Sequence, residues 1–520
     1  MRTSVEPNIK EESAVRLEEK IAAMCVIGVP SLEAGQPFRE RLSRYPYGGI
    51  GLFPHNIQSE RQLRQLVEEV EALAAGEQLP VPYYLSIDEE AGSLSNFKSF
   101  YPFIPGNGAV GVGDDPEAAF LLGKLIGSQL YELGIPMNWG PVLDVNTNID
   151  NPVIGIRSFG SDAEKTAAFG QAYIRGLHEA GAAATAKHFP GHGQVSGDSH
   201  YMLPECTLTA EELRQGPLVP FAAAIEAGVD AIMTAHLVFP NIEEAGGLPA
   251  SLNPWFVTKL LREEMQFNGV ICTDDVEMKA IRDHYEPEEI GVLAVQAGND
   301  MVLMCHTADF QDRVVAGIVA AVQDGRIRME QIDESYERIR QLRCKFSVYR
   351  SDAVPFPKEK WKEEAKRLAR RTVHVLADPQ QLLPLDPSRR YLLLLPEQVR
   401  LTVADTSASS GISLAPLLQS YGITVDTLPC SIDPESSEIG QILVQCDSYD
   451  CILQGTINAH LFHGQLRLAE QLAAVKPLLH LVLRNPYDAE YLPPTSGKVL
   501  LCSTSHYSLL AFAEAAVTRK

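Results

Sequence analysis

The sequence predicts an α/β fold in which a TIM-like (β/α)8 barrel is followed by a smaller α/β/α sandwich domain. Over the first two thirds of the chain, eight short apolar runs alternate with amphipathic helical patterns, as in parallel strands covered by helices. Polar residues follow these runs, as expected at the carboxyl ends of barrel strands. A second, shorter series of runs fills the last third of the chain, which favours an open sheet with helices on its faces.

Each predicted barrel strand is a short apolar run bounded by polar or turn-forming residues, and a charged helix over residues 1–20 is expected to precede the first. The strands are predicted at Met24–Val29, Gly48–Phe53, Tyr83–Asp88, Pro136–Val145, Ala182–His188, Ala231–His236, Gly269–Asp274 and Asp300–Cys305. The helices around them are predicted at Ser59–Ala75, Glu117–Leu133, Ala163–Ala180, Ala210–Ala227, Pro254–Phe267, Glu288–Ala297 and Met329–Leu342.

Changes in this pattern predict the domain boundaries. The barrel domain is expected over residues 1–345, a linker and connecting helix over 346–374, and the sandwich domain over 375–520. The last domain carries no motif to which chemistry can be assigned, so we expect it to brace the barrel or to shape the rim of the site. Its strands are predicted at Tyr391–Leu395, Ile423–Leu428, Cys451–Gln454, Leu478–Leu483 and Val499–Ser503.

The composition argues against several classes of partner. A net charge of −23 argues against binding to nucleic acid or to an anionic membrane surface, and no stretch is long and apolar enough to span a bilayer. The first twenty residues are rich in glutamate, unlike a secretory signal. The nine cysteines are scattered, and several lie inside apolar runs, which predicts buried free thiols and a cytoplasmic setting. Nothing in the pattern indicates an oligomeric state.

The stretch Lys187–Gly193, followed by Asp198, Ser199 and His200, holds the densest set of titratable residues. A predicted strand leads into it, and Pro190 with two glycines ends the strand, so these side chains are expected in a loop that can carry catalytic groups. Asp198 can orient the imidazole of His200 and stabilise its charged form, which suits a general acid that later acts as a base. Taken alone, the tripeptide is equally compatible with a loop that has no chemical role.

Two carboxylates end the predicted seventh strand. Asp274 is closer to the strand and therefore more rigidly held, so we interpret it as a nucleophile at the barrel mouth. Asp275 is expected to orient Asp274 or the neighbouring backbone. The alternative is that one carboxylate caps the next helix while the other pairs with a base.

Arg157 lies in the loop that follows Asp144 and the fourth strand. A guanidinium at the rim can reach a sugar hydroxyl or a carboxylate through a forked pair of hydrogen bonds, and a structural salt bridge is the alternative. We expect no metal and no cofactor. His188 and His192 are four residues apart, but the proline and glycine between them prevent a helical zinc-binding face. His192 is expected to brace the loop internally.

Together these motifs resemble glycoside hydrolase family 3 and, within it, the β-N-acetylhexosaminidase branch. The resemblance covers residues 15–345 closely and reaches the second domain more loosely, through Arg484–Asp488 and Leu492-Pro493. Its specificity rests on the order and spacing of several stretches. These are Gly140–Asp144 with Asn151–Phe159, Lys187–Gly193 with Asp198–His200, Leu248–Leu252 and Phe267–Asp275.

The resemblance implies a retaining exo-β-N-acetylglucosaminidase that hydrolyses terminal β-linked N-acetylglucosamine in cell-wall muropeptides or chitin oligosaccharides. The expected partner is therefore a small carbohydrate. Asp274 would be the nucleophile that forms a covalent glycosyl-enzyme, and His200, polarised by Asp198, would be the acid/base. The hydroxyls of the terminal sugar would be bound by Asp88, Arg157, Lys187 and His188.

One stretch departs from the family pattern. After the third strand the family usually shows Asp-x-Glu-Gly-Gly-Arg, whereas this chain has Ala91 in place of a glycine and Ser93 in place of the arginine. The departure bears on the substrate more than on the chemistry.

Two alternatives to the hydrolase follow from the same residues. One is a phosphorylase of the same branch that acts on N-acetylglucosaminides or β-glucosides, because an imidazole leaves less negative charge against phosphate than a glutamate would. The other is a non-catalytic sugar-binding paralogue, for which the altered stretch at Ser93 would be the cause. The presence of both Asp274 and His200 argues against the paralogue.

Overall fold

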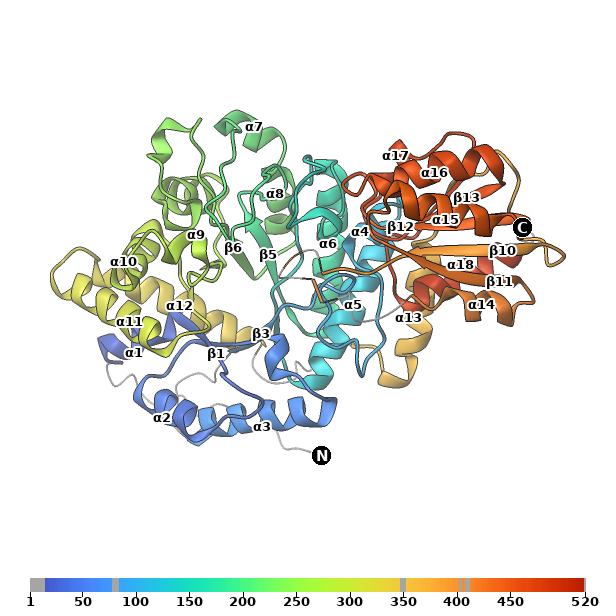
Figure 1. Cartoon of the computed structure of the whole chain (residues 1–520). Helices are drawn as coiled ribbons and strands as arrows, with labels where there is room; N and C mark the ends of the chain where they lie inside the picture. The colour runs from blue at the N-terminus through green and yellow to red at the C-terminus, as the bar shows by residue number, and fades with distance from the viewer. Residues whose placement is uncertain are drawn as a thin grey trace.

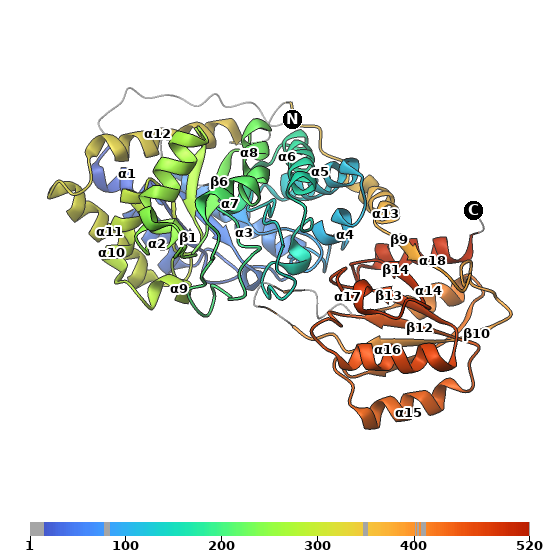
Figure 2. The same cartoon turned by 90° about the horizontal axis from the view of Figure 1, so that it is seen from above.

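A computed structural model describes residues 15–76, 84–346, 352–400, 402, 405–406 and 412–518 of the chain. It consists of an eight-stranded barrel surrounded by helices and a second α/β domain beside it (Figure 1). The second domain lies next to the part of the barrel that carries α4 (Asn107–Gly111), as the view from above shows (Figure 2). The predicted fold class is therefore confirmed.

All eight predicted barrel strands are present. Neighbouring strands are parallel and follow the order β7-β6-β5-β4-β3-β2-β1-β8, and a parallel bridge between Cys272 and Met301 brings the two ends together. The barrel therefore closes without a free edge. The strands are β1 (Cys25–Gly28), β2 (Gly49–Leu52), β3 (Tyr84–Ile87), β4 (Met137–Asn138), β5 (Ala183–Phe189), β6 (Ala231–Thr234), β7 (Val270–Thr273) and β8 (Val302–Leu303).

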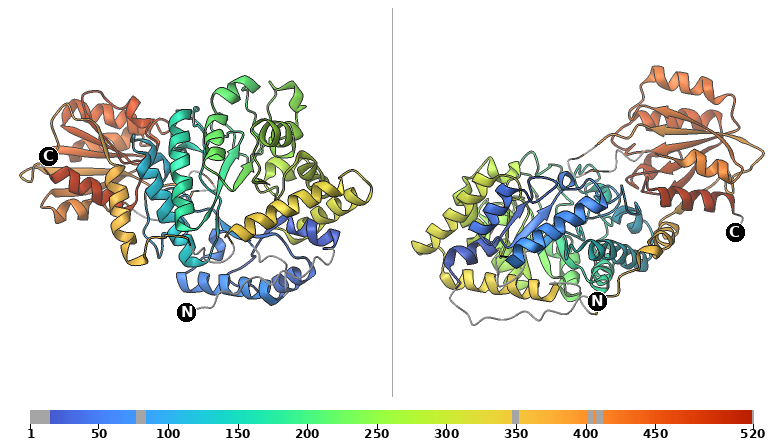
Figure 3. Two further views of the ribbon diagram at one scale, coloured as in Figure 1. Left: turned by 180° about the vertical axis from the view of Figure 1, so that it is seen from behind. Right: turned by 90° about the horizontal axis from the view of Figure 1, so that it is seen from below.

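Helices form a ring around these strands (Figure 3). Alanine and leucine recur at helical spacing along their inner faces, which lie buried against the barrel. Besides α4, the helices are α1 (Leu17–Ala23), α2 (Gln36–Arg44), α3 (Glu60–Gly76), α5 (Pro116–Leu133), α6 (Ala163–Ala180), α7 (Ala210–Gln215), α8 (Leu218–Glu226), the π-type helix η5 (Trp255–Glu264), α9 (Lys279–Arg282), α10 (Pro287–Ala297), α11 (Ala308–Gln323) and α12 (Met329–Phe346).

The helices differ from the prediction at one position, include one that was not predicted, and leave one prediction largely untested. The single helix predicted over Ala210–Ala227 is broken into α7 and α8, because Pro217 has no N–H to continue the ladder of α7. The helix α11 was not predicted, although its apolar residues recur at helical spacing. The charged helix predicted over residues 1–20 lies largely outside the described residues, and only α1 represents it.

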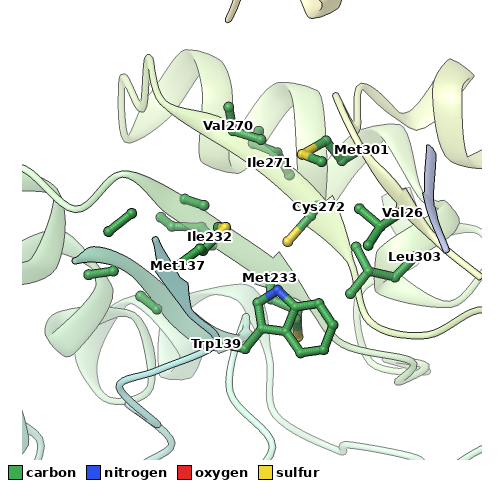
Figure 4. Close-up of a cluster of buried hydrophobic side chains, with 14 of the residues drawn as sticks. Val26, Met137, Trp139, Ile232, Met233, Val270, Ile271, Cys272, Met301 and Leu303 are labelled. Atoms are coloured by element: carbon green, nitrogen blue, oxygen red, sulfur yellow. The ribbon is translucent and has the colours of Figure 1, made fainter. Parts of the chain in front are cut away.

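The inside of the barrel is a packed apolar core rather than a channel. Side chains from neighbouring strands, among them Ile232, Met233 and Ile271, fill the interior, and Trp139 lies across it just beyond β4 (Figure 4). The polar residues that follow these strands lie beyond this packed core, at the mouth of the barrel.

The second domain is a sheet between two layers of helices. Along β10, Leu393 and Leu395 face one apolar cluster, whereas Leu392 and Leu394 face another, as expected for a sheet buried on both sides. The sheet order is β11-β10-β12-β13-β14-β9. Its elements are β9 (His374–Ala377), β10 (Arg390–Pro396), α14 (Leu414–Ser420), β11 (Thr424–Cys430), α15 (Ser436–Cys446), β12 (Cys451–Thr456), α16 (Gly464–Val475), β13 (Leu478–Val482), α17 (Asp488–Tyr491), β14 (Gly497–Leu500) and α18 (His506–Val517).

All five predicted strands of this sheet are present, but the edge strand β9 was missed. It begins at His374, inside the stretch predicted as linker and helix, and pairs antiparallel with β14. Val375 and Leu376 are more than half exposed, so the apolar signal of this strand is short and lacks the continuous burial of its neighbours. The connecting helix itself is present as α13 (Trp361–Arg371).

Two further features bear on the chain as a whole. All nine cysteines are free; eight of them are buried and Cys344 is exposed. Across the described ranges, no helix combines the length and apolar character that crossing a bilayer would require.

Candidate active site

Backbone hydrogen bonds continue around the mouth of the barrel beyond the strands themselves. The N–H of Trp139 donates to Ile87 (2.9 Å), that of Ala235 to Phe189 (2.7 Å) and that of Asp274 to Thr234 (2.9 Å). The residues that leave β3 to β7 are therefore fixed relative to one another, and the polar side chains beyond them start from rigid positions.

Asp274, at the end of β7, is surrounded by imidazoles from three different segments. Burial favours its neutral form, but the nearby imidazoles of His188 and His236, the N–H of Asp275 and the imidazole of His200 lower its pKa to about 2. The N–H of Asp275 donates to Oδ1 of Asp274 at 2.8 Å. Asp274 is therefore ionised at neutral pH and keeps Oδ2 available to a ligand.

Asp274 makes no ion pair with any residue that the structure describes, in contrast to the carboxylates around it. Asp275 was expected to orient Asp274 or the nearby backbone, and its side chain does the second. Its Oδ1 accepts from the N–H of Glu277 (2.9 Å), and its Oδ2 pairs with His306 (3.1 Å). Only the backbone of Asp275 contacts Asp274.

Asp198 and His200 form the expected pair. Oδ1 of Asp198 accepts hydrogen bonds from the backbone N–H of His200 (2.8 Å) and lies 2.7 Å from its Nδ1. Burial tends to lower the pKa of His200, but the hydrogen bond to Asp198 and the charges of Asp198 and Asp274 raise it above its ordinary value. The charge of Asp274 is thus one of the influences on this imidazole.

The loop after β5 is organised by Asp144, which is completely buried. Oδ2 of Asp144 lies 2.7 Å from Nδ1 of His188, and its Oδ1 accepts from the backbone N–H of His192 at 2.6 Å. Nε2 of His192 lies 3.4 Å from Oγ of Ser199, so the loop also touches the segment that carries His200. Burial lowers the pKa of His192 to about 4, which keeps this imidazole neutral.

Arg157 and Lys187 are joined by a carboxylate that was absent from the predicted site residues. Glu90 receives two hydrogen bonds from the Arg157 guanidinium, both at 2.8 Å, and its Oε1 lies 2.6 Å from the ammonium of Lys187. Lys187 also binds Asp88. Burial alone would raise the pKa of Glu90, but the two cations hold it well below its usual range.

This geometry changes the interpretation of the two cations. Lys187 and Arg157 are almost completely buried, and both form ion pairs with carboxylates. Arg157 therefore makes the structural salt bridge that was the alternative to sugar binding. Asp88 keeps about 30% of its side chain exposed and remains accessible from the mouth. Glu90 and Asp144 both stand close to the predicted end of a strand, since Asp144 is the last residue but one of Pro136–Val145 and Glu90 comes two residues after Asp88. That position indicates the mouth of the barrel, although it does not indicate their partners.

The second domain contacts the loop that carries Arg157. Nδ2 of Asn146 donates to the hydroxyl of Tyr487 at 2.6 Å, and Gly155 lies so close to Asn485 that a Cβ atom there would meet its amide at 3.2 Å. Ile156 packs in an apolar cluster with Val482 and other residues of the second domain. The rim of the mouth is therefore shaped partly by the second domain, as the sequence had suggested.

Chemically, the mouth offers an ionised carboxylate that forms no ion pair with the described residues, Asp274, and an imidazole whose protonated form is stabilised, His200. That combination suits nucleophilic attack assisted by proton transfer. The described residues contain no group of three or more His, Cys, Asp or Glu side chains placed to hold a metal ion.

Comparison with known proteins identifies the family. Residues 16–342 match the profile described as the glycosyl hydrolase family 3 N terminal domain. This chain belongs to glycosyl hydrolase family 3. The resemblance inferred from its motifs is thereby confirmed.

Relatives within family 3 carry related names. The chain is 34% identical over 288 residues to the beta-hexosaminidase of Idiomarina loihiensis, and the match covers 55% of this chain and 84% of the relative. A family 3 beta-N-acetylglucosaminidase from Paenibacillus has the same fold, with a TM-score of 0.88, 33% identity and 97% coverage of both chains. A beta-glucoside phosphorylase matches with a TM-score of 0.79 over 98% of this chain and 93% of its own, but at 20% identity it supports the fold alone.

The departure from the family 3 pattern has a structural counterpart. Ala91 has φ of 59°, in the left-handed region that glycine adopts without cost, which fits its place where the family usually has glycine. Ser93, in place of the arginine, contacts a segment of the second domain through its backbone. Its carbonyl accepts from the N–H of Thr406 at 2.8 Å, and Oγ1 of Thr406 accepts from the N–H of Ser95 at 3.0 Å.

The buried ion pairs of Glu90 generate a prediction about stability. Glu90→Gln removes the charge between two buried cations, so we expect the free energy of unfolding to fall by about 3–5 kcal/mol at pH 7. Because the folded pKa of Glu90 is depressed, the wild-type advantage should be present above about pH 4.3 and decline as the pH falls below it. Denaturant unfolding followed by tryptophan fluorescence would measure this, since all three tryptophans lie in the barrel or in α13.

The matched control is Glu337→Gln, which removes an exposed ion pair with Arg340 on α12. It should change the free energy of unfolding by less than about 1 kcal/mol. Equal effects of the two substitutions would contradict the importance assigned to the buried pairs.

Proposed function

We propose that this family 3 chain is a retaining exo-β-N-acetylglucosaminidase that releases terminal β-linked N-acetylglucosamine through a covalent glycosyl-aspartate intermediate. The observation that carries the proposal is the contrast between two carboxylates at one mouth: Asp274 is ionised and unpaired, whereas Asp198 is bonded to His200. One of them is free to attack, and the other supports a proton donor.

In the first step, Oδ2 of Asp274 attacks the anomeric carbon. The bond from that carbon to the glycosidic oxygen breaks, and the oxygen takes a proton from Nε2 of His200. Nδ1 of this imidazole is occupied by Asp198 at 2.7 Å, so Nε2 is the nitrogen left to face the substrate. The carboxylate of Asp198 stabilises the protonated ring before the transfer and fixes its orientation throughout.

In the second step, His200 removes a proton from water as the water oxygen attacks the anomeric carbon. The bond between sugar and Asp274 breaks, which returns the carboxylate and gives a product with the starting configuration. An imidazole takes the place of the usual second carboxyl group here, so the separation expected between two carboxyl groups does not apply.

We assign the terminal sugar to the side of the mouth that contains Asp88 and His188. Asp88 is partly exposed and can accept a hydrogen bond from a sugar hydroxyl, while Lys187 holds it in place. Arg157 and Lys187 contribute through donors that their ion pairs with Glu90 leave unused. The glycans that suit this chemistry are cell-wall muropeptides and chitin oligosaccharides. A cytoplasmic site of action remains a prediction from the sequence.

The nucleophile assignment predicts the outcome of Asp274→Ala. This variant should fold normally but lose more than about 10³-fold in kcat on an aryl β-N-acetylglucosaminide, because it lacks the carboxylate that forms the intermediate. Asp283→Ala, which removes an exposed carboxylate on the segment that follows, is the control and should remain active. The assays should be run with and without phosphate. Near-normal turnover by Asp274→Ala would refute the mechanism, and sugar 1-phosphate as the main product would identify a phosphorylase.

The acid role of His200 predicts a dependence on the leaving group. His200→Ala should reduce kcat/KM by about 10²–10⁴-fold on alkyl glycosides and much less on nitrophenyl glycosides, whose leaving oxygen needs little protonation. His284→Ala, an exposed histidine close in sequence to α9, should leave both substrates unaffected. Equal losses on both substrate classes would count against proton donation by His200.

The Asp198–His200 pair predicts the direction of a pH shift. The carboxylate of Asp198 raises the pKa of His200, and the acid form is required for the first step, so activity should decline as the pH rises through this pKa. Asp198→Asn removes the charge and should move the alkaline limb of the kcat/KM profile to lower pH. The profile of kcat/KM against pH would test this, and an unchanged alkaline limb would assign it to another group.

A further inference from the structure

The residue that follows His200 has an exposed aromatic ring. Tyr201 is 61% exposed, more than any other tyrosine, phenylalanine or tryptophan among the residues the structure describes, and Met202 beside it is 57% exposed. Large apolar side chains that are exposed to solvent next to a catalytic loop are candidates for contact with a ligand. Tyr201 directly follows His200, the proposed proton donor, and this position restricts which part of a substrate could contact the ring.

This exposure belongs to a well-bonded segment. The backbone N–H groups of Tyr201 and Met202 both donate to the carbonyl of Asp198 at 3.0 Å. The N–H of Ala280, in α9, donates to the carbonyl of Ser199 at 3.3 Å. This hydrogen bond joins the segment that carries Tyr201 to the segment that follows Asp274, two residues before Tyr201 and one residue after Lys279.

Lys279 supplies a cation at the same place. Its ammonium nitrogen lies 5.9 Å from the centroid of the Tyr201 ring, and Lys279 stands five residues after Asp274 at the start of α9. No carboxylate in the described part of the chain forms an ion pair with Lys279, whereas Arg282 on the same helix pairs with Asp283 at 3.7 Å. The chain has a net charge of −23 and so offers many carboxylates. A lysine beside the site that pairs with none of those described is therefore a candidate partner for an anionic group of the substrate.

We propose that Tyr201 and Lys279 form the binding site for the leaving group, and that this site selects a ring bearing a carboxylate. The proposal rests on the function proposed above, because a proton donor must face the glycosidic oxygen, and the group attached to that oxygen then lies against the residues beside the donor. The face of Tyr201 stacks on the ring of the leaving group, and Met202 extends the apolar surface. The ammonium of Lys279 attracts the carboxylate.

The part of the mouth that contains Lys187 and Arg157 is less suitable for such a group. There Lys187 and Arg157 are buried and already paired with carboxylates, so neither offers a free charge to an anionic substituent. The terminal sugar and the leaving group are thus assigned to two sides with different chemistry. One side has buried, compensated charges, and the other has an exposed ring and an unpaired cation.

A pair of substrates isolates the charge. The first is 4-(carboxymethyl)phenyl β-N-acetylglucosaminide, and the second is its amide, which has nearly the same size and leaving-group acidity. The wild-type protein should prefer the acid by about two- to fivefold in kcat/KM at low salt, and the preference should diminish as salt screens the pair. Lys279→Met should bring the ratio of kcat/KM between the acid and the amide to about one, whereas Lys259→Met, at an exposed lysine of η5, should retain the wild-type ratio.

A second pair isolates the ring. Tyr201→Ala should lower kcat/KM on the amide by about two- to tenfold and leave the methyl glycoside unchanged, because a methyl group has no ring to stack. Tyr421→Ala, an exposed tyrosine of the second domain, is the control.

The outcomes separate the two proposals. Retention of the acid preference by Lys279→Met, or equal losses on methyl and aryl glycosides by Tyr201→Ala, would overturn the assignment of the leaving-group site while the proposed hydrolase stands. Wild-type protein that cleaves none of these N-acetylglucosaminides would overturn the proposed function and this site with it.

Discussion

The site depends on one buried negative charge. Glu90 carries a carboxylate that burial would make very costly, and the cost is offset by the guanidinium of Arg157 and the ammonium of Lys187. Glu90 and Arg157 lie in the segments that follow β3 and β4, and Lys187 lies in β5. Removing any of them leaves an uncompensated charge in the interior, so the three segments are required to close together as the barrel folds. The ion pairs of Glu90 therefore both bring the segments of the rim together and stabilise them.

The distribution of partners among the carboxylates explains how similar side chains can differ in role. Asp88, Asp144, Asp198 and Asp275 each lie against a lysine or a histidine. Asp274 lies among imidazoles but forms no ion pair with the described residues, and its carboxylate accepts a hydrogen bond from the backbone N–H of Asp275. A carboxylate that is ionised and yet unengaged is reactive toward an electrophilic carbon. Its neighbours, being engaged, act by orienting other groups.

Local patterns in the sequence predicted the barrel strands, Asp274 and the Asp198–His200 pair, because each depends on residues close together in the chain. The partners of Arg157 and Lys187 could not be predicted in this way. Glu90 is 67 residues from Arg157, and nothing in the spacing indicates that the barrel brings them within 2.8 Å. The edge strand β9 was missed for a related reason, since its pairing with β14 joins segments that are more than 120 residues apart.

The contact between Ser93 and Thr406 has a consequence for how this protein can be divided. A barrel cut off at α13 would expose the apolar side chains of Ala109, Val112 and Ile156 that pack against the second domain, and the amide of Asn146 would lose the hydroxyl of Tyr487. The loops under Asp88 and Arg157 would lose their outer support at the same time. Removing the second domain is thus a poor way to obtain a smaller active enzyme, because this domain supports the loops at the rim of the site.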